Sequence, residues 1–493
     1  MTSPSHLTLE EHSMTLQRVN MFVESEPFRT ASGVINGLIQ EELKQLGAEV
    51  TPFYKHRLGR ADMLMPVATA DRARQLQGRP PADLAIFCDQ GLWIRPPGPA
   101  VAKQSLVVFH GLIGGQNLWL DNPAVNQYCA YSRYMREVLV SLLTMPDMRR
   151  RKCLDPQGFY KVSDFAAGLP CVADSKGDER MLGAELPEQI VRSIEAGDVV
   201  GHALQPRKPD WYAVLNILVH LNLMSREEGG PRYRLVVDAE DFALIDYSFG
   251  HGFPLDMTGP RSLLEALGMT VGDLLIPVRF LSQPALFQFF KLAKFGLSYN
   301  VYPEPFGFYP LESVFHGCPV YTNGIGNNRH NVPPEHGVRV IESVDMAFGD
   351  PSAFQEVARA IIGDVRSREG VTRDCARGRE YVLRHFGREA FSRTWRACLA
   401  RLEQPLPEPE PFESLRVLRS PIVRQIDAET GRVVSDFERL TLEPRELGML
   451  REAEGQPIGE VLRGLGEADT DLLQGLFSRA VLTLRPRGYD VGL

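Results

Sequence analysis

The stretch Glu304 to Ser313, EPFGFYPLES, places two glutamates on either side of a glycine in an otherwise apolar run. The residues that follow, Val314 to Thr322 (VFHGCPVYT), predict a helix that ends at a glycine and then a strand. A glycine-containing turn that leads into a helix can bind an anion through its backbone amides. We therefore expect Glu304 and Glu312 to accept hydrogen bonds from a ligand held at this turn.

The segment LSYNVY predicts a strand, so Glu304 falls where that strand ends. Tyr309 to Phe315 is the predicted helix, with Glu312 about one turn inside it. Two carboxylates beside a phosphate-binding turn suit a nucleotide-sugar, because one can hold the sugar and the other the ribose. The structural alternative makes Glu304 a solvated residue at a strand end and Glu312 a residue of the helix surface. The apolar neighbours disfavour exposure of both.

The composition limits the classes of protein that the chain can belong to. Its 493 residues predict two or three domains, and its net charge of -8 argues against nucleic acid as the main partner. The 7 cysteines are dispersed, which predicts reduced thiols and neither a disulfide framework nor a zinc site. We expect no signal peptide, no transmembrane segment and a cytoplasmic location.

Short apolar runs alternate with helical periodicity along most of the chain, which predicts parallel sheets covered by helices. We predict an N-terminal Rossmann-like domain at 1–195 and a second one at 196–403. A proline- and glutamate-rich linker follows at 404–412. Residues 413–493 predict a hairpin that turns at Ala428–Gly431 and three short helices, a small α+β domain like a winged helix.

A second possible phosphate site lies near the N-terminus. Ser25 to Gly33 is the loop predicted to enter the first helix, which is expected to begin near Val34. Because Gly33 has no Cβ, a phosphate can approach the backbone and meet the amides of the helix N-terminus. The alternative is that Gly33 only permits a turn.

These motifs resemble a known family. Glu304-Pro-Phe-Gly-x-x-x-Leu-Glu312, followed by His-Gly-Cys-Pro-Val, is similar to the E-x7-E signature of retaining GT-B glycosyltransferases, family 4 and its relatives. SGVINGLIQEELKQLGAEV resembles the first glycine loop and helix of the family, and VVFHG resembles the strand that ends at a histidine, here His110. The resemblance covers about residues 18–403. It implies an α/β GT-B fold, in which two Rossmann-like domains face a cleft and the last helix returns to the first domain.

The resemblance also implies an activity and a set of site residues. The activity is the transfer of a sugar, with retention, from a UDP- or GDP-linked donor to an acceptor, without a metal or another cofactor. Glu304 and His110 would act on the donor sugar, and Arg207 and Lys208 would neutralise the diphosphate. The other residues that would bind the nucleotide-sugar are Ser32, Gly33, Phe306, Gly307, Phe308, Tyr309 and Glu312.

One segment departs from the family pattern. The second domain of the family begins with G-R-L-x-x-x-K-G, whereas this chain has GHALQPRKP at residues 201–209. His202 stands in place of the arginine, which leaves open a weakened or inactive enzyme. One alternative is therefore a non-catalytic GT-B scaffold that binds a nucleotide-sugar or a protein partner. Another is a phosphorylase or epimerase of the same fold, which the absence of any lysine after Lys294 disfavours for a pyridoxal-dependent phosphorylase.

The acceptor is not encoded in a motif. The module at 413–493 weakly resembles winged-helix peptide-recognition domains, which implies a peptide or protein acceptor. A role in oligomerisation is the alternative. The acidic balance of this module makes DNA the less expected partner.

Overall fold

The computed structural model describes most of the chain. The described residues are 16–23, 31–54, 81–88, 102–111, 125–169, 185–203, 208–252, 255, 258–279, 281–341 and 351–489.

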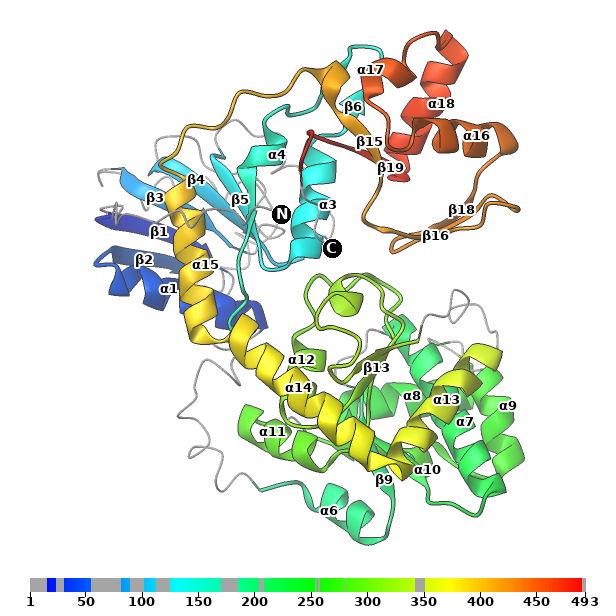
Figure 1. Ribbon diagram of the computed structural model, residues 1–493. Coiled ribbons are helices and arrows are strands. Elements are labelled where there is room, and N and C mark those ends of the chain that lie inside the picture. Colours follow the sequence, from blue (N-terminus) through cyan, green and yellow to red (C-terminus); the bar gives the residue numbers. More distant parts are fainter. Residues whose placement is uncertain are drawn as a thin grey trace. The chain divides into compact units, whose positions relative to one another are not determined.

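The backbone contacts divide the chain into two compact units, each made of segments that are distant in sequence. Unit 1 consists of residues 1–167, 389–420 and 445–492, and unit 2 consists of residues 168–388 and 421–444, with residue 493. Each unit is built around one six-stranded parallel sheet, so the predicted α/β class with two Rossmann-like sheets is confirmed (Figure 1).

The sheet of unit 1 is parallel throughout and mostly buried. Phe22, on the second strand from one edge, is buried and stacks on Phe53 and Phe87, with ring centroids 4.9 and 4.7 Å apart. In spatial order its strands are β2 (Glu49–Tyr54), β1 (Arg18–Val23), β3 (Ala82–Phe87), β4 (Ala102–Phe109), β5 (Gln127–Ala130) and β8 (Val162–Asp164). The accompanying elements are α1 (Ala31–Gln45), α3 (Arg133–Leu143), α4 (Gly158–Lys161), α15 (Arg388–Arg401) and the short pair β6 (Pro146–Asp147) and β7 (Lys152–Cys153).

Helix α15 packs on unit 1, as the resemblance implied for the last helix before the linker. Arg396 Nε donates to Glu42 Oε1 over 2.7 Å, and Ser392 Oγ donates to Glu42 Oε2 over 2.7 Å. Trp395 of the same helix packs edge-on against Phe165. Because Glu42 is fully buried, these charged and polar partners satisfy a carboxylate that would be costly to leave without them.

The sheet of unit 2 has the strand order of a Rossmann fold, 3-2-1-4-5-6 in its own sequence. In space the strands are β11 (Leu275–Val278), β10 (Tyr233–Asp238), β9 (Val199–His202), β12 (Gly296–Ser298), β13 (Val320–Thr322) and β14 (Val338–Val340). The order reverses between β9 and β12, which pair in parallel at His202 and Gly296. Ligands of such sheets bind outside the carboxyl ends of the strands at this reversal.

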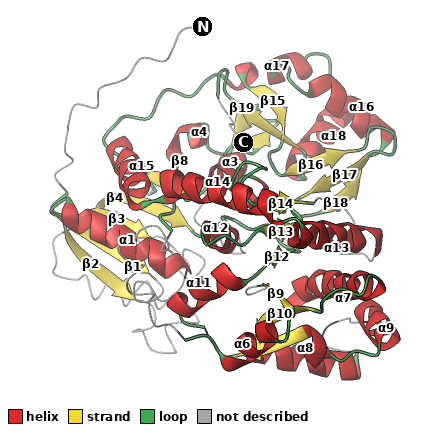
Figure 2. Cartoon of the chain, turned by 60° about the horizontal axis from the view of Figure 1, so that its bottom comes forward, coloured by secondary structure: helices red, strands yellow, loops and turns green. Residues whose placement is uncertain are grey.

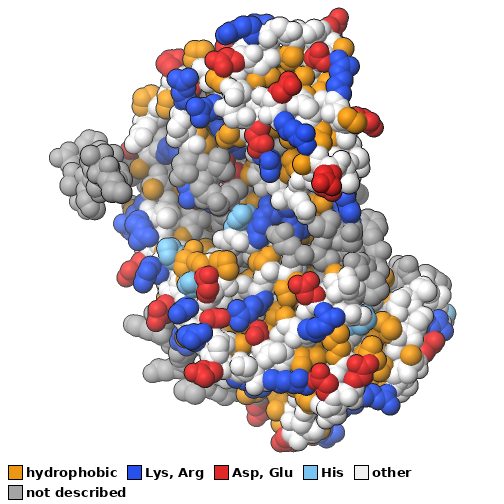
Figure 3. Space-filling model, turned by 45° about the vertical axis from the view of Figure 1, so that its right-hand side comes forward, with side chains coloured by type: hydrophobic (Ala, Val, Ile, Leu, Met, Phe, Trp, Pro, Cys, Tyr) orange, Lys and Arg blue, Asp and Glu red, His pale blue; other side chains and the backbone are white. Residues whose placement is uncertain are grey.

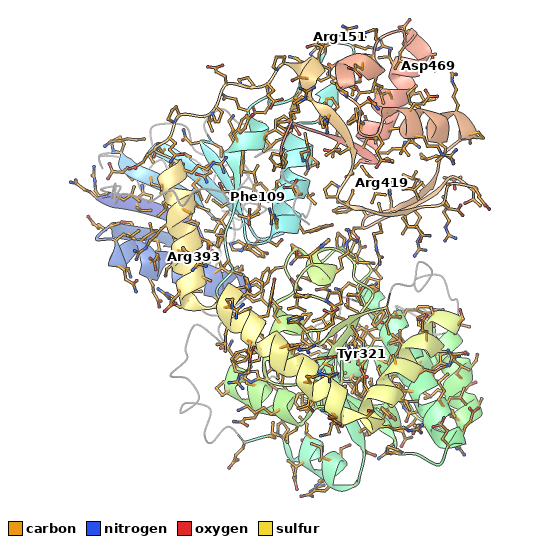
Figure 4. The ribbon with its side chains drawn as sticks, in the orientation of Figure 1. Phe109, Arg151, Tyr321, Arg393, Arg419 and Asp469 are labelled. Atoms are coloured by element: carbon orange, nitrogen blue, oxygen red, sulfur yellow. The ribbon has the colours of Figure 1, made fainter. Side chains whose placement is uncertain are left out.

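Nine helices and two 3-10 turns belong to the described part of unit 2. Helices α7 and α13 lie side by side in Figure 1. Together they contribute many residues to one hydrophobic core, among them Trp211 of α7 and Phe354 of α13. Tyr321, labelled in Figure 4, is buried and donates to Asp364 Oδ2 over 2.6 Å. The helices are α6 (Glu188–Glu195), α7 (Trp211–Glu227), α8 (Ala239–His251), α9 (Thr258–Leu267), α10 (Val271–Leu274), α11 (Gln283–Leu292), α12 (Phe308–Phe315), α13 (Pro351–Arg366) and α14 (Arg368–Phe386), and the 3-10 turns are η5 (Lys208–Asp210) and η6 (Asn327–Arg329).

The C-terminal segment contributes to both units. Strands β15 (Arg416–Arg419) and β19 (Leu482–Arg485) pair in unit 1 and are accompanied by η8 (Phe412–Ser414), α16 (Pro444–Ala453), α17 (Ile458–Val461) and α18 (Glu467–Ser478). Strands β16 (Val423–Ile426), β17 (Arg432–Ser435) and β18 (Arg439–Thr441) form a separate antiparallel sheet in unit 2 (Figure 2). We call these three strands, residues 423–441, the hairpin sheet. The hairpin predicted to turn at Ala428–Gly431 and the three helices are confirmed.

The predicted domain boundaries stay predictions. The backbone contacts divide residues 413–493, which were expected to form a single module, between the two units. The linker expected at 404–412 lies wholly within unit 1, after α15 and up to the first residue of η8. The hairpin sheet contacts unit 2, while the strands and helices before and after it contact unit 1. The winged-helix-like arrangement expected for residues 413–493 stays a prediction.

Candidate functional site

The stretch EPFGFYPLES lies at the reversal of strand order in unit 2. Strand β12 ends at Ser298, and the chain then runs through Glu304 and Gly307 to α12. The neighbouring strand β9 ends at His202. The glycine turn and both glutamates therefore follow the strand that borders the switch point, which is where an open α/β sheet holds its ligands.

The turn before α12 requires glycine. Gly307 caps the helix with a φ of 88°, and a Cβ placed on it would lie 2.3 Å from Asn328 Oδ1 and 2.5 Å from Asn331 Nδ2. The Gly307 amide donates to Glu304 Oε1 over 3.2 Å. The turn thus brings one carboxylate oxygen to the start of the helix, and only a residue without a side chain fits there.

Glu304 is also held through its backbone. It forms an isolated parallel bridge with Gly326, and the Asn327 amide donates to the Glu304 carbonyl over 2.7 Å. A Cβ on Gly326, whose φ is 72°, would lie 2.4 Å from both the nitrogen and the oxygen of Glu304. The loop after β13 therefore fixes the position of Glu304, and its glycine permits the close approach.

Glu312 is the fifth residue of α12 and is 9% exposed. Burial raises the pKa of its carboxyl group to about 8. Within the described part of the chain, no side-chain hydrogen bond to this carboxylate is formed. A ligand with hydroxyl groups would supply the hydrogen bonds that stabilise its ionised form.

Helix α12 is tied to both strands at the switch point. The Tyr309 hydroxyl lies 3.0 Å from the Leu297 carbonyl of β12 and 3.3 Å from the His202 carbonyl of β9. Phe306 packs edge-on against Phe308, with ring centroids 4.8 Å apart. These contacts fix the position of the first turn of α12, which begins at Phe308. The backbone amides of this turn favour the binding of an anion.

His202 is a core residue. Its side chain is fully buried, and Nε2 lies 3.1 Å from Ser313 Oγ and 3.3 Å from Cys318 Sγ. Its ring packs against Phe290, with centroids 4.7 Å apart. Burial lowers the pKa of His202 to about 3, so the ring is neutral near pH 7 and supplies no charge to a phosphate. The position that an arginine has in the family pattern is thus filled here by a side chain that faces the core.

The side chains of the two cations expected to neutralise a diphosphate lie outside the described part of the structure. Arg207 lies outside the described residues, and only the backbone position of Lys208, the first residue of η5, is described. Asp210, at the end of η5, accepts from the Val301 amide over 2.6 Å. This bond ties the end of η5 to the segment that leaves β12. The roles of Arg207 and Lys208 stay predictions.

The site residues predicted in unit 1 lie after β4, in the case of His110, and in α1, in the case of Ser32 and Gly33. Phe109, labelled in Figure 4, is the last residue of β4, and His110 follows it. His110 Nε2 lies 3.0 Å from Asn36 Oδ1 of α1, and the Tyr131 hydroxyl donates to the His110 carbonyl. Asn36 therefore fixes the orientation of the imidazole, a contact that no sequence motif indicated.

The glycine predicted in a loop before the first helix lies inside that helix. Helix α1 begins at Ala31, so Ser32 and Gly33 occupy its first turn. Their amides still point out of the helix N-terminus, as a phosphate site requires. The start of the helix differs by three residues from the expected one. Helix ends are the least certain part of a periodicity argument, because the first turn has no internal partner that fixes it.

Sequence reasoning missed the asparagines that support the turn. Asn327 Nδ2 donates to the Phe306 carbonyl over 2.7 Å, and Asn328 Nδ2 donates to Ser298 Oγ over 3.1 Å. Both are buried. The signal was present as an asparagine-rich run, GIGNNRHN, because buried amides must find partners.

The described part of the chain contains neither a cluster of metal ligands nor a membrane-spanning helix. No group of three His, Cys, Asp or Glu residues could hold a metal ion among the described residues. No described helix is both long and apolar enough to cross a bilayer. On the face drawn in Figure 3, acidic and basic side chains are interspersed.

Comparison with known proteins identifies the fold. No protein-family model matches the sequence, and no curated protein matches it. HepE of Anabaena, solved with UDP and glucose, is similar with a TM-score of 0.50 at 12% identity, over 78% of this chain and 99% of that one. Sucrose-phosphate synthase of Thermosynechococcus elongatus gives 0.50 at 15% identity, over 78% and 99%. An α,α-trehalose-phosphate synthase of Burkholderia vietnamiensis gives 0.55 at 10% identity, over 80% and 99%.

These structures are GT-B glycosyltransferases, and the chain has the GT-B fold. The expected fold class is confirmed. The sheet of unit 2 has the strand order of a Rossmann fold. At such low identity the likeness establishes the fold alone.

Proposed function

We propose that the chain is a glycosyltransferase that moves a sugar, with retention, from a nucleotide-sugar to an acceptor. The observation that carries this proposal is the arrangement of Glu304, Gly307 and Glu312 at the switch point of the unit 2 sheet. A glycine turn with a helix N-terminus lies between two carboxylates, one half-buried and one almost fully buried. This is the chemistry that a diphosphate with a polyol on each side requires.

Each part of the turn has one task in this proposal. Glu312 accepts hydrogen bonds from the ribose hydroxyls, and Glu304 accepts hydrogen bonds from the donor sugar. The amides of Phe308 and Tyr309 face the diphosphate and stabilise the negative charge that develops as it leaves. Stabilisation of a leaving group by fixed dipoles is commonly the largest catalytic contribution, and the loss of one donor costs about 10²–10³ in rate.

The first donor to test is a UDP-sugar. HepE, which shares the fold, was solved with UDP and glucose. We propose a peptide or protein as the acceptor, and the alternative role for the C-terminal segment is oligomerisation.

The second candidate is a GT-B scaffold that binds a nucleotide-sugar without turnover. The neutral, buried His202 favours it, because the arginine of the family pattern has no counterpart there. Binding is common to both candidates, and turnover separates them.

The test begins with a thermal-shift screen of nucleotide-sugars, followed by calorimetry with UDP. Hydrolysis of each nucleotide-sugar that binds is then measured for the wild type, Glu312→Ala and Glu304→Gln. The matched control is Glu265→Gln, a substitution of an exposed residue of α9. We expect UDP binding in the wild type, a loss of turnover of about 10²-fold or more in both site variants, and none in the control. Binding without turnover in the wild type would establish the scaffold. Unchanged turnover in Glu312→Ala would refute the enzyme proposal, and the anomeric configuration of the product, read by NMR, decides retention.

A further inference from the structure

The loop that follows β13, residues 323–331, is held to the glycine turn by hydrogen bonds. The Asn327 amide binds the Glu304 carbonyl, and its side chain binds the Phe306 carbonyl, both over 2.7 Å. Gly326 forms the bridge with Glu304. Any displacement of this loop must therefore displace the backbone on which Glu304 and the turn depend.

The other side of the same loop is held by the C-terminal segment. Arg329, the last residue of η6, uses three nitrogens. Its Nη1 donates to Asp436 Oδ1 over 2.9 Å, its Nη2 to the Pro421 carbonyl over 3.0 Å, and its Nε to His330 Nε2 over 2.9 Å. Two of these three partners come from residues 421–444, about a hundred positions further along the chain.

The ion pair between Arg329 and Asp436 is enclosed. The Asp436 side chain is 0% exposed and that of Arg329 is 14% exposed. Removal of one charge from a buried pair leaves the other without compensation, whereas an exposed pair contributes little. The pair is therefore a strong constraint on the position of η6.

A second bond links the hairpin sheet to the loop. Arg424 of β16 donates from Nη2 to the Asn323 carbonyl over 2.5 Å, and its side chain is 5% exposed. The Asp436 amide donates to the carbonyl of Ile422, the residue before β16, over 2.9 Å, so Asp436 is itself held in place. The loop thus lies between the hairpin sheet on one side and the glycine turn on the other.

We propose that Asp436 is a positioning residue of the donor site, which holds Arg329 and, through η6, the backbone of Glu304 and the glycine turn. This inference rests on the proposed function, since it assigns the C-terminal segment a part in donor binding. Asp436 touches no donor atom in this scheme. The hairpin sheet, which lies outside the E-x7-E motif, then sets the geometry of that motif.

A purely structural role for Asp436 predicts different results. If the pair only stabilised the hairpin sheet, its loss would reduce the folded fraction. The apparent kcat would fall and the donor KM would stay the same. A positioning role changes the site in molecules that are folded, so the donor KM and the dissociation constant of UDP rise.

The experiment compares Asp436→Asn with Asp427→Asn in the full chain. Asp427 lies in the same hairpin sheet, but its carboxylate is held within its own turn, by the amides of Glu429 and Thr430 and by the Thr430 side chain. Hydrogen exchange of peptides that cover residues 304–312 is followed by mass spectrometry, together with UDP affinity and the donor KM and kcat. For Asp436→Asn we expect roughly tenfold faster exchange at 304–312 and roughly tenfold weaker UDP binding. Asp427→Asn should match the wild type.

Faster exchange confined to residues 421–441, with residues 304–312 and the UDP affinity unchanged, would overturn the inference. If Asp436→Asn does not fold, Arg329→Lys keeps a cation beside Asp436 but cannot make all three bonds, and the same readouts apply. If the wild type binds no UDP, the proposed function fails, while the exchange measurement still decides whether Asp436 holds the turn.

Discussion

Gly326 and Glu304 approach so closely that a Cβ on the glycine would lie 2.4 Å from the backbone nitrogen and oxygen of the glutamate. The two residues are 22 positions apart in sequence and form a bridge outside the main sheet. This contact joins the loop after β13 to the turn before α12, so the position of Glu304 depends on the loop.

Gly326→Ala should move Glu304 and weaken the candidate site. The φ of 72° at this position is unfavourable for alanine, and the added methyl group meets backbone, which cannot rotate away. We expect a loss of more than about 2 kcal/mol in the free energy of unfolding and a loss of UDP binding. Chemical denaturation and calorimetry measure the two effects. Gly363→Ala, in α13 with open space around it, is the control and should be neutral or stabilising.

Glu312→Gln should change how stability depends on pH. Burial raises the pKa of Glu312 to about 8, above its unfolded value of 4.5, so the folded state keeps a proton that the unfolded state releases. The contribution of Glu312 to the stability of the wild type should therefore be greatest below pH 4.5 and should fall as the pH rises toward 8. The free energy of unfolding should fall by at most about 1.4 kcal/mol per pH unit from this group. Glutamine carries no such proton, so its slope should be flatter.

Urea denaturation between pH 5 and 8.5 measures this difference, with the exposed Glu335→Gln as control. Parallel slopes for the wild type and Glu312→Gln would show that Glu312 is ionised in the folded protein throughout this range.

His202→Arg, which restores the residue of the family pattern, should destabilise the protein and not raise its activity. The side chain is enclosed by Ser313, Cys318 and Phe290, so a guanidinium would be larger than the space and would be buried without a counter-charge. We expect a loss of more than about 3 kcal/mol in the free energy of unfolding. His202→Gln, which is neutral, should cost less. A His202→Arg variant of wild-type stability with higher turnover would contradict the core position of this residue.

Arg485→Met should destabilise unit 1. Arg485 donates from Nε and Nη2 to Glu137 Oε2 over 3.1 and 3.0 Å, and the two side chains are 1% and 0% exposed. Because the variant leaves a buried carboxylate with fewer partners, we expect a loss of about 3 kcal/mol in the free energy of unfolding. Thermal and chemical denaturation measure it. Arg487→Met, whose side chain is exposed, should change stability by less than about 0.5 kcal/mol.

The contact between Arg485 and Glu137 also determines how the C-terminal segment can be studied. Deletion of residues 412–493 would remove β19 and Arg485 from α3, as well as Asp436 from Arg329. A truncated chain would therefore lose stability in both units, and a loss of acceptor binding could not be assigned to recruitment. Point variants at Arg485 and at Asp436 separate these effects.

The sequence predicted the elements around the candidate site well. The strand before Glu304, the glycine turn and the helix that carries Glu312 all occur, and α12 begins at Phe308, one residue before the expected start. Each of these follows from a short-range pattern: an apolar run for the strand, a glycine where φ is positive, and helical periodicity. The βα alternation predicted the two parallel sheets for the same reason.

The sequence alone did not predict the environment of His202. Whether the ring at the end of β9 faces a phosphate or the core depends on Ser313 and Cys318, more than a hundred residues away. The start of the first helix was also misplaced by three residues, which puts Gly33 in the first turn of α1.

What the sequence determined by itself is therefore the GT-B pattern of strands and helices, and the glycine turn with its two glutamates. These are local, because backbone preference and side-chain periodicity act over a few residues. Only the tertiary structure decided that Asn327 supports the turn, that Arg329 pairs with Asp436, and that the C-terminal segment is shared between the two units. Such contacts join residues far apart in sequence, and a buried amide or charge shows in the sequence only that it needs a partner, whereas packing determines which partner it meets.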